Sequence, residues 1–260
     1  MALRSIFLFV PAESGAIWAG PPAYAVALAR ACGANLTAFA VALDVTTPGP
    51  AADPAAVADA IAEAARGAGV DCTVMTTHSH AVTVHEAISL HARLHDLVVI
   101  GTDDNSLLSE RDLAEHLLFQ SGRPVLLVPP SAESAAETAR VAVAWDSSAS
   151  AARALGDALA LLPVETASFL TVTGEKDLPG GIEPAMVVEA TGRRGVSASH
   201  AFAELGGRSI AAALQEEAQA GGASLLVMGA FAHSSLRRLV LGSATGGLLA
   251  ELEMPVLLAR

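Results

Sequence analysis

Small residues follow a short apolar run near the end of the chain, in a pattern that suits the binding of an anion. Leu225–Met228 is apolar and ends at Gly229, and a second helical pattern opens with Gly242 and Ser243. Glycine lets the backbone approach a ligand closely, and the first turn of a helix offers unpaired N–H groups and a partial positive charge. This combination predicts a site for a phosphate group.

A carboxylate is the second candidate for chemistry. Asp146 directly follows the apolar run Val141–Trp145. Its oxygens can accept hydrogen bonds from the amino group or hydroxyls of a ligand, or they can cap the helix that follows, and both interpretations stay open. Ligands of open parallel sheets bind beyond the carboxyl ends of the strands, and we expect both Asp146 and the loop after Gly229 to lie at that edge.

Apolar runs alternate with helical patterns along the chain, which predicts parallel α/β sheets with right-handed crossovers. The expected strands are Ser5–Val10, Leu36–Leu43, Asp71–Thr77, Leu97–Ile100, Val125–Val128, Val141–Trp145, Ser168–Val172, Val196–Ala201, Leu225–Met228 and Val256–Leu258. The expected helices are Pro22–Cys32, Ala55–Arg66, Val84–Leu94, Asp112–Gln120, Ser148–Leu161, Ser209–Ala220 and Ser243–Leu252, while Met186–Ala190 is ambiguous.

The pattern occurs twice, and the polar segment Pro129–Thr138, which contains two prolines, is typical of a linker between the copies. The sequence Val-Val-Ile-Gly at 98–101 matches Leu-Val-Met-Gly at 226–229, and both halves close with a similar Pro-Val-Leu-Leu run. This internal repeat predicts two domains, residues 1–130 and residues 139–260.

Gly229, Ala232, Gly242 and Ser243 stand at the spacing of the nucleotide-phosphate motif of universal stress proteins. That motif is glycine, two residues, glycine, nine residues, glycine and then serine or threonine, so Ala232 departs from it. The sequence resembles this family over nearly its whole length as two tandem domains, well in the second half and weakly in the first. The resemblance implies an α/β fold of two doubly wound, five-stranded parallel-sheet domains of the adenine-nucleotide α-hydrolase-like kind, paired about a pseudo-two-fold axis.

The resemblance further implies that the second domain binds ATP or ADP, with or without magnesium. Asp146 would lie near the adenosine, and Val172, which ends the next expected strand, would lend backbone groups to the adenine. The implied nucleotide-binding residues are Asp146, Val172, Gly229, Ala232, Gly242, Ser243, Ala244 and Thr245.

The first half lacks these features. Pro11 stands where the second half has its aspartate, and Arg111 and Asp112 replace the glycine and serine of the motif. The intervening loop carries Asp103 and Asp104, whose charges repel phosphate. We expect this half to be a degenerate partner domain that does not bind ATP in the family's way.

Composition excludes several classes of protein. The chain of 260 residues is 52% hydrophobic, carries a net charge of −12 and has no half with a net positive charge, which argues against a general nucleic-acid binder. No apolar run reaches the length of a membrane span, and a soluble cytoplasmic protein is expected. Cys32 and Cys72 form neither a disulfide framework nor a metal spacing, and we expect small core residues.

Six of the eight histidines lie in the first half, where such a set could hold Zn²⁺, but no cysteine accompanies them at metal spacing and we expect no metal site. The sequence has no Walker A loop, no Gly-x-Gly-x-x-Gly after the first strand and no Gly-x-Ser-x-Gly elbow, so we expect no enzyme.

The leading hypothesis is a tandem universal stress protein that binds an adenine nucleotide in its second domain and acts in stress signalling or protection, with an unknown protein partner. A nucleotide-free interaction module of the same fold is one alternative, supported by Ala232. An enzyme of a related adenine-nucleotide superfamily is the other. The domains are expected to pair within the chain, and a homodimer stays open.

Overall fold

The computed structural model describes residues 2–12, 20–43, 53–79, 83–102, 110–132, 137–173, 182–230 and 252–260. The chain divides into two compact units, Met1–Ala136 and Glu137–Arg260. The boundary between them falls within the polar segment Pro129–Thr138.

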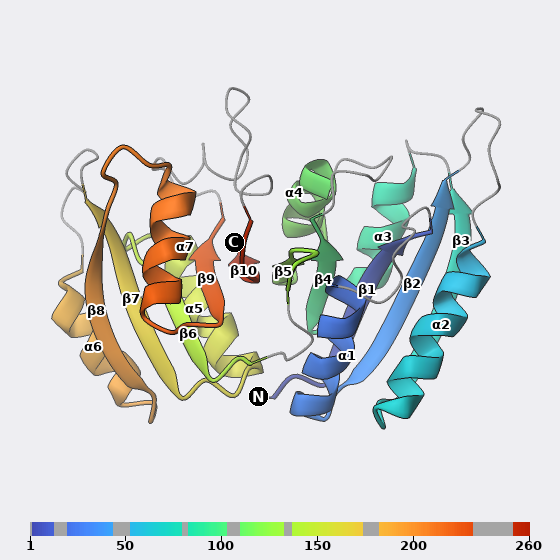
Figure 1. The fold of residues 1–260 in the computed structure, drawn as a ribbon, viewed down its shortest axis with the longest axis horizontal. Coiled ribbons are helices and arrows are strands. Elements are labelled where there is room, and N and C mark those ends of the chain that lie inside the picture. The colour runs from blue at the N-terminus through green and yellow to red at the C-terminus, as the bar shows by residue number, and fades with distance from the viewer. Residues whose placement is uncertain are drawn as a thin grey trace. The chain divides into compact units, whose positions relative to one another are not determined.

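The first unit, coloured blue to green in Figure 1, is a parallel sheet with the strand order β3-β2-β1-β4-β5. Its strands are β1 (Ser5–Pro11), β2 (Asn35–Leu43), β3 (Cys72–Ser79), β4 (Leu97–Gly101) and β5 (Val125–Val128). Its helices are α1 (Pro21–Cys32), α2 (Pro54–Gly67), α3 (Val84–Ala92) and α4 (Glu110–Gln120).

The second unit, coloured yellow to red in Figure 1, repeats this arrangement with the strand order β8-β7-β6-β9-β10. Its strands are β6 (Arg140–Ala144), β7 (Thr166–Thr173), β8 (Ser197–Glu204), β9 (Leu225–Gly229) and β10 (Val256–Ala259). Its described helices are α5 (Ala149–Leu161), α6 (Pro184–Gly192) and α7 (Ile210–Ala220). In each unit the first strand therefore pairs with the second and the fourth.

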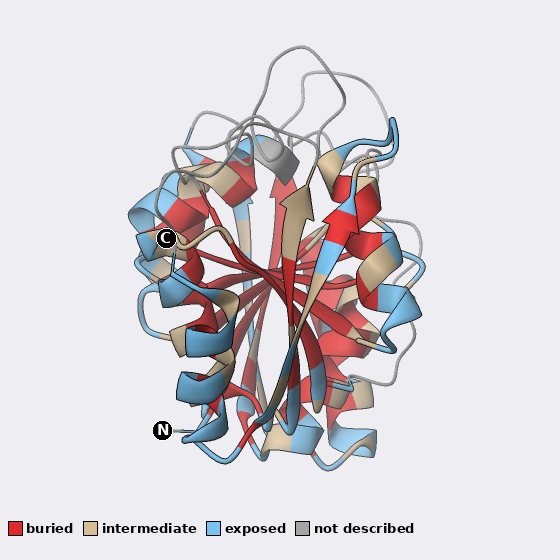
Figure 2. Ribbon diagram, turned by 90° about the vertical axis from the view of Figure 1, so that its left-hand side faces the viewer, coloured by how far each residue is buried: buried red, intermediate tan, exposed pale blue. Residues whose placement is uncertain are grey.

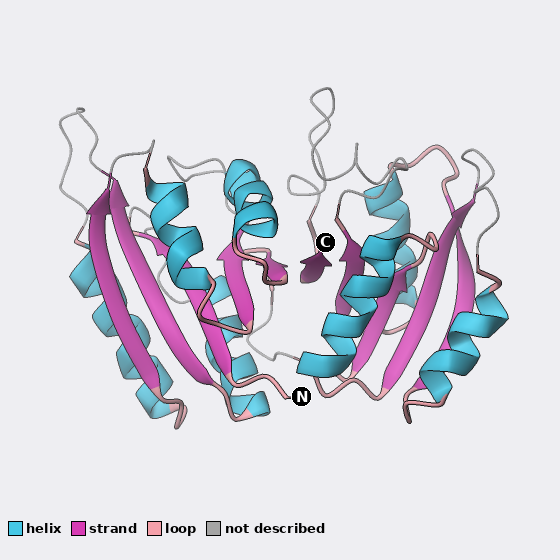
Figure 3. Cartoon of the chain, turned by 180° about the vertical axis from the view of Figure 1, so that it is seen from behind, coloured by secondary structure: helices cyan, strands magenta, loops and turns pink. Residues whose placement is uncertain are grey.

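Helices cover both faces of each sheet, as Figures 1 and 3 show. In the first unit α1 and α2 lie on one face and α3 and α4 on the other; in the second unit α5 and α6 lie opposite α7. Figure 2 shows buried strands between helices whose outer faces are exposed. Strands β4, β5, β9 and β10 are buried almost throughout, because helices cover both faces of the sheet. Their sequences are accordingly continuous apolar runs.

The predicted α/β fold with doubly wound parallel sheets is confirmed. The ambiguous segment Met186–Ala190 belongs to α6, which Pro184 opens, a residue suited to the first turn of a helix. The helix predicted at Ser243–Leu252 lies outside the described residues, apart from Leu252 itself, and the pseudo-two-fold pairing of the domains stays a prediction. The expectation for the cysteines was wrong: both are half-buried, because Cys32 ends α1 and Cys72 opens the edge strand β3.

Candidate functional site

Three of the predicted nucleotide-binding residues lie at the carboxyl ends of neighbouring strands in the second unit. The last residue of β6 pairs with Leu170 of β7 and with Met228 of β9. Asp146 follows the end of β6 by two residues, just as Val172 follows Leu170, and Gly229 comes directly after Met228. The chain order of the strands reverses between β6 and β9, which is the switch point where open α/β sheets bind ligands.

The turn after β6 is held by its own side chains. Asp146 Oδ1 accepts a hydrogen bond from Ser148 N at 3.0 Å, and Ser148 Oγ accepts one from Ala151 N at 3.1 Å. Ser148 is therefore the residue that caps α5, and Asp146 shapes the turn in front of the cap. The alternative in which Asp146 itself caps the helix is wrong.

Ser147 has an unusual backbone conformation in this turn. Its φ of 61° is in the left-handed region, where it is alone among the described residues other than glycine. The Ser147 Oγ accepts a hydrogen bond from Ile182 N at 2.9 Å. This bond ties the segment that leads into α6 to the turn after β6, and it compensates for part of the backbone strain.

Gly229 is required by packing inside the second unit. A Cβ atom at this position would lie 2.4 Å from Ala151 N and 2.5 Å from the carbonyl carbon of Ser150, both in the first turn of α5. The sequence suggested that this glycine admits a ligand, but here the atoms that approach it are those of a helix. The end of β9 and the N-terminus of α5 are thereby brought together, a contact that the motif spacing does not reveal.

An aromatic and polar cluster lies beside this edge. Trp145 is 6% exposed and stacks edge-on against Phe169 with 5.7 Å between ring centroids. Its Nε1 finds no acceptor among the described residues. Thr171 Oγ1 donates to Trp145 O at 3.2 Å and lies 3.0 Å from His200 Nε2. Burial lowers the pKa of His200. Sequence reasoning missed this cluster because its members come from three strands.

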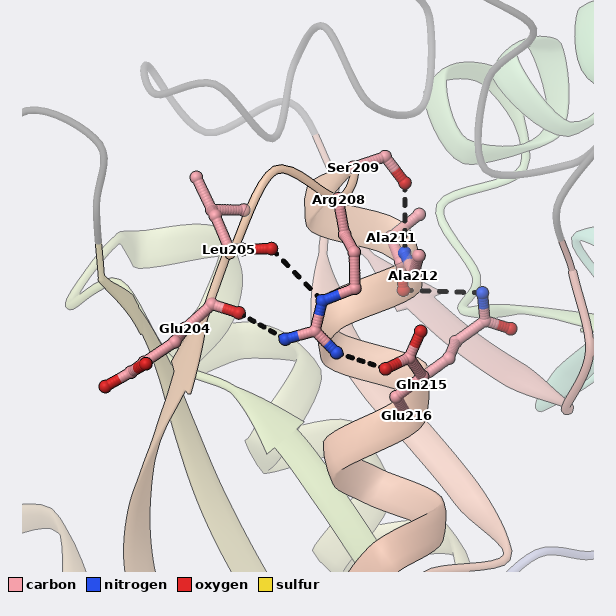
Figure 4. Close-up of polar contacts among 8 residues, drawn as sticks. All are labelled: Glu204, Leu205, Arg208, Ser209, Ala211, Ala212, Gln215 and Glu216. Carbon is pink, nitrogen blue, oxygen red and sulfur yellow. Dashed lines mark hydrogen bonds and ion pairs between the residues drawn. The ribbon is translucent and has the colours of Figure 1, made fainter.

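The connection from β8 to α7 is built around Arg208, as Figure 4 shows. The guanidinium donates to the carbonyl oxygens of Glu204 at 2.6 Å and Leu205 at 3.1 Å and pairs with Glu216 on α7. These contacts join the last residue of β8, the connection and α7. Arg208 therefore fixes the path of the chain at the carboxyl end of β8.

Gln215 is a buried polar residue on α7, only 2% exposed. Its Nε2 donates to Ala211 O at 3.4 Å (Figure 4), and its Oε1 accepts a hydrogen bond from Glu253 N at 2.8 Å. Glu253 lies in the segment that enters β10. Gln215 thus joins α7 to the chain just after the segment in which the sequence places the phosphate motif.

The rest of that motif lies outside the described residues: Ala232, Gly242, Ser243, Ala244 and Thr245. In the first unit Pro11 ends β1, at the position that corresponds to the turn of Asp146. Arg111 and Asp112 lie in the first turn of α4, and Asp103 and Asp104 lie outside the described residues.

Four of the six histidines of the first unit lie in two pairs. His95 lies with Nδ1 3.0 Å from His91 O and Nε2 2.9 Å from Thr37 Oγ1. The rings of His85 and His116 are 5.6 Å apart, and the buried Nε2 of His85 has no partner in the described part of the chain. The structure forms no group of three or more potential metal ligands among the residues it describes, and His80 is not one of them.

Within the described ranges, no helix combines the length and apolar character needed to traverse a membrane.

Residues 137–260 match the model of the universal stress protein family, the same residues that form the second unit. The second unit is therefore a domain of the universal stress protein family, and the resemblance inferred from the sequence is confirmed. No curated protein sequence matches the chain.

Solved structures share the fold of the whole chain. A universal stress protein from Archaeoglobus fulgidus DSM 4304 is 16% identical over 98% of this chain and 96% of that chain, with a TM-score of 0.65. A candidate universal stress protein from Pseudomonas aeruginosa UCBPP-PA14 is 15% identical over 99% of this chain and 93% of that chain, with a TM-score of 0.52. Because both relatives cover the whole chain, the first unit also fits the tandem arrangement of this fold.

Proposed function

We propose that the second unit binds an adenine nucleotide, ATP or ADP, at the carboxyl edge that carries Asp146, Val172 and Gly229. The main support for this proposal is the register of the strands. It brings the three residues to the carboxyl ends of neighbouring strands at the switch point of a universal stress protein domain. Ligands of open α/β sheets bind at this point, and the resemblance of the sequence to the family implies the same three residues.

Each group at the edge has a chemical role in this proposal. The Asp146 carboxylate accepts hydrogen bonds from ribose hydroxyls or from the adenine amino group. The backbone at Val172 hydrogen-bonds the edge of the base. The phosphates interact with the backbone N–H groups of the segment that contains Ala232, Gly242, Ser243, Ala244 and Thr245, and magnesium would neutralise part of their charge.

We further propose that the protein is a stress-linked signalling or protective module rather than an enzyme. The loop and elbow motifs of nucleotide hydrolases and esterases are missing from the sequence. A bound nucleotide would then be retained and would report on the state of the protein, instead of being turned over rapidly. The first unit would bind none, because Pro11 offers no side-chain acceptor where the second unit has Asp146.

The nucleotide content of the protein as purified tests this proposal. Protein that has never met added nucleotide is denatured, and the released molecules are identified by mass spectrometry. We expect ATP or ADP at close to one molecule per chain. Two per chain would contradict the assignment of the first unit, and no nucleotide together with no thermal shift in ATP and Mg²⁺ would contradict the binding proposal itself.

Asp146 is tested by calorimetric titration of nucleotide-free protein with ATP. We expect Asp146→Ala to weaken binding by at least about tenfold, because a buried hydrogen bond to a charged group contributes about 1.5–3 kcal/mol. Asp157→Ala is the matched control, since it removes the same charge from the same unit at an exposed pair with Arg153 on α5. Equal affinities for the two variants would remove Asp146 from the site.

A protein-interaction module without nucleotide is the second candidate function, and Ala232 favours it because a motif glycine is missing there. An Ala232→Gly variant distinguishes the two candidates. Strong ATP binding by the variant alone would identify a lapsed nucleotide site, whereas equal binding by both proteins supports a working one. A cytoplasmic location and a homodimer stay predictions.

A further inference from the structure

Three large apolar side chains are exposed at one end of the first unit. Leu90 lies on α3, Leu94 lies in the turn that follows α3, and Phe119 lies in the last turn of α4. Their exposed fractions are 50%, 78% and 36%. Single exposed apolar residues are common on protein surfaces, but grouped ones mark binding sites for other molecules.

Two arginines join these residues into one surface. Arg93 Nε donates to Gln120 O at 3.0 Å, and Arg123 donates through Nε at 3.2 Å and Nη2 at 2.8 Å to Arg93 O. The ends of α3 and α4 are therefore held side by side. Leu94 is next to Arg93 in sequence, and Phe119 is next to Gln120. We call Leu90, Arg93, Leu94, Phe119 and Arg123 the α3–α4 patch.

Within the described part of the chain, the two arginines of the patch form no ion pair with a carboxylate. Among the described residues no Asp or Glu oxygen lies within salt-bridge distance of Arg93 or Arg123. The arginine–carboxylate pairs that the described residues do form are all in the second unit: Arg140–Glu137, Arg153–Asp157, Arg193–Glu189 and Arg208–Glu216. The nearby carboxylate of Asp96 accepts its hydrogen bonds from Arg4 N, Ser5 N and Ser5 Oγ instead. In a chain with a net charge of −12, two arginines with no described carboxylate at salt-bridge distance, beside exposed leucines, are a distinctive combination.

The patch lies away from the edge where ligands of this fold bind. Helices α3 and α4 lead directly into β4 and β5, so their last turns lie at the amino ends of these parallel strands. At the matching position of the second unit, Gly222 stands two residues beyond α7 where Leu94 stands two residues beyond α3. An occupant of the patch would therefore leave the carboxyl edge of this sheet accessible.

We propose that the α3–α4 patch is a docking surface for an acidic amphipathic segment of another protein. Leucine-like side chains of that segment pack on Leu90, Leu94 and Phe119, while its carboxylates pair with the guanidinium groups of Arg93 and Arg123. Arginine pairs with carboxylates in a forked geometry, and helical segments commonly bind through apolar residues spaced along one face. The first unit then has a recognition role that does not require a nucleotide.

Fluorescence anisotropy with the full chain tests this proposal. The probe is a fluorescein-labelled helix-forming peptide of about 16 residues, with leucines along one face and glutamates beside them. A second peptide carries lysine in place of glutamate, and a third carries serine in place of leucine. We expect only the first peptide to bind, with an affinity that falls as salt is raised, because salt screens the charge pairs.

Variants locate the binding surface. We expect Leu94→Ser and Arg93→Glu each to weaken binding of the acidic peptide by about tenfold or more, as truncation of a central apolar or arginine contact does. Met186→Ser is the matched control, because Met186 is 61% exposed on α6 of the second unit. Circular dichroism of all three variants separates lost binding from lost folding.

Three outcomes overturn the proposal. The first is that none of the peptides binds, and the second is that the acidic and basic peptides bind equally well. The third is self-association, detected by sedimentation velocity and removed by Leu94→Ser, which would make a second copy of this chain the occupant instead.

Discussion

In the second unit, Asp146 follows the end of β6 by two residues, and the side chains of Asp146 and Ser147 hold the turn; in the first unit, Pro11 ends β1 and Ala12 follows it. Both units nevertheless have the same order of five parallel strands. The buried strands therefore fix the fold in each unit, while the residues at the strand ends are free to differ. The comparison of the two units shows that this fold keeps its buried core when the residues at the carboxyl edge of the sheet change.

The units also differ in where charge and apolar surface are exposed. The arginine–carboxylate pairs that the described residues form belong to the second unit, whereas the arginines of the α3–α4 patch have no described carboxylate within salt-bridge distance. We infer a division of labour, with nucleotide binding in the second unit and recognition of another protein in the first.

The largest effect is expected from Gly229→Ala. The added Cβ would lie 2.4 Å from Ala151 N, a distance that requires α5 or β9 to move. We expect the free energy of unfolding to fall by about 3 kcal/mol or more, even without nucleotide. Guanidinium unfolding measures the loss, and hydrogen exchange should show it in β9 and α5 of the second unit before the strands of the first.

Gly156→Ala is the matched control, because Gly156 lies on α5, the helix that approaches Gly229. Nothing lies within 4 Å of a Cβ at Gly156, so the substitution should stabilise α5 by about 0.5–1 kcal/mol through its higher helix propensity. If Gly229→Ala left stability unchanged and only weakened ATP binding, the glycine would serve the ligand and the packing explanation would be wrong.

A smaller change in the free energy of unfolding, of opposite sign in the two units, is expected from substitutions of two buried polar residues. Gln215 accepts a hydrogen bond from Glu253 N, whereas Ser89 on α3 is 1% exposed and its Oγ has no partner among the described residues. We expect Gln215→Leu to cost about 1–2 kcal/mol and Ser89→Ala to be neutral or to stabilise by up to about 1 kcal/mol. Thermal unfolding of both variants measures the contrast, and destabilisation by Ser89→Ala would reveal a hydrogen bond to this hydroxyl.

The strand framework could be predicted because its signal is local. Val125–Val128 and Leu225–Met228 are apolar runs bounded by glycine or proline, and both became strands with bounds within one residue of those expected. The α6 helix was ambiguous for a physical reason. It has nine residues, and of these only Val187 and Thr191 are buried, so it shows little apolar periodicity.

The candidate site was only partly predictable. Asp146 and Gly229 could be placed at the sheet edge because each directly follows or ends a recognisable strand. The sequence did not reveal that packing requires a glycine at position 229. That requirement comes from the approach of α5, whose residues lie far from Gly229 in the sequence. The contact of Thr171 with Trp145 and His200 depends on the register of three strands, which no local pattern gives.

Lowering the pH should destabilise the first unit through protonation of His85. Burial is the main cause that lowers the pKa of His85; the neighbouring His116 lowers it further, and Asp112 opposes the shift. The unfolded chain then binds a proton more readily than the folded one, so stability is fully present above the ordinary value of 6.5 and is lost as the pH falls below it.

Guanidinium unfolding from about pH 7.5 to about pH 5 measures this loss for the parent and for His85→Phe. The profile of the variant should be flatter. His200→Phe is the matched variant in the second unit, where burial also lowers the pKa of the histidine. Parallel profiles for the parent and His85→Phe would show that protonation of His85 is not coupled to folding.

The smallest change in the free energy of unfolding is expected from substitutions in the turn after the first strand of each unit. Ser147 has a φ of 61°, whereas Ala12, the corresponding residue of the first unit, is not among the residues with positive φ. Both Ser147→Gly and Ser147→Ala lose the hydrogen bond to Ile182 N, but only the alanine variant keeps the backbone strain. We expect the glycine variant to be about 1 kcal/mol more stable than the alanine variant.

At position 12 the difference in stability between glycine and alanine should have the opposite sign, with alanine the more stable. Ala12→Gly relieves no strain there and adds freedom to the unfolded chain, so it should destabilise by a few tenths of a kcal/mol to about 1 kcal/mol. Thermal unfolding of the variants measures both differences. If glycine were favoured at both positions, the two turns would share one backbone conformation, and the contrast between the units would lie in their side chains alone. If glycine is favoured only at 147, the backbone of the two edges has itself diverged, because a side chain that bonds across to Ile182 holds only the second turn in the left-handed region.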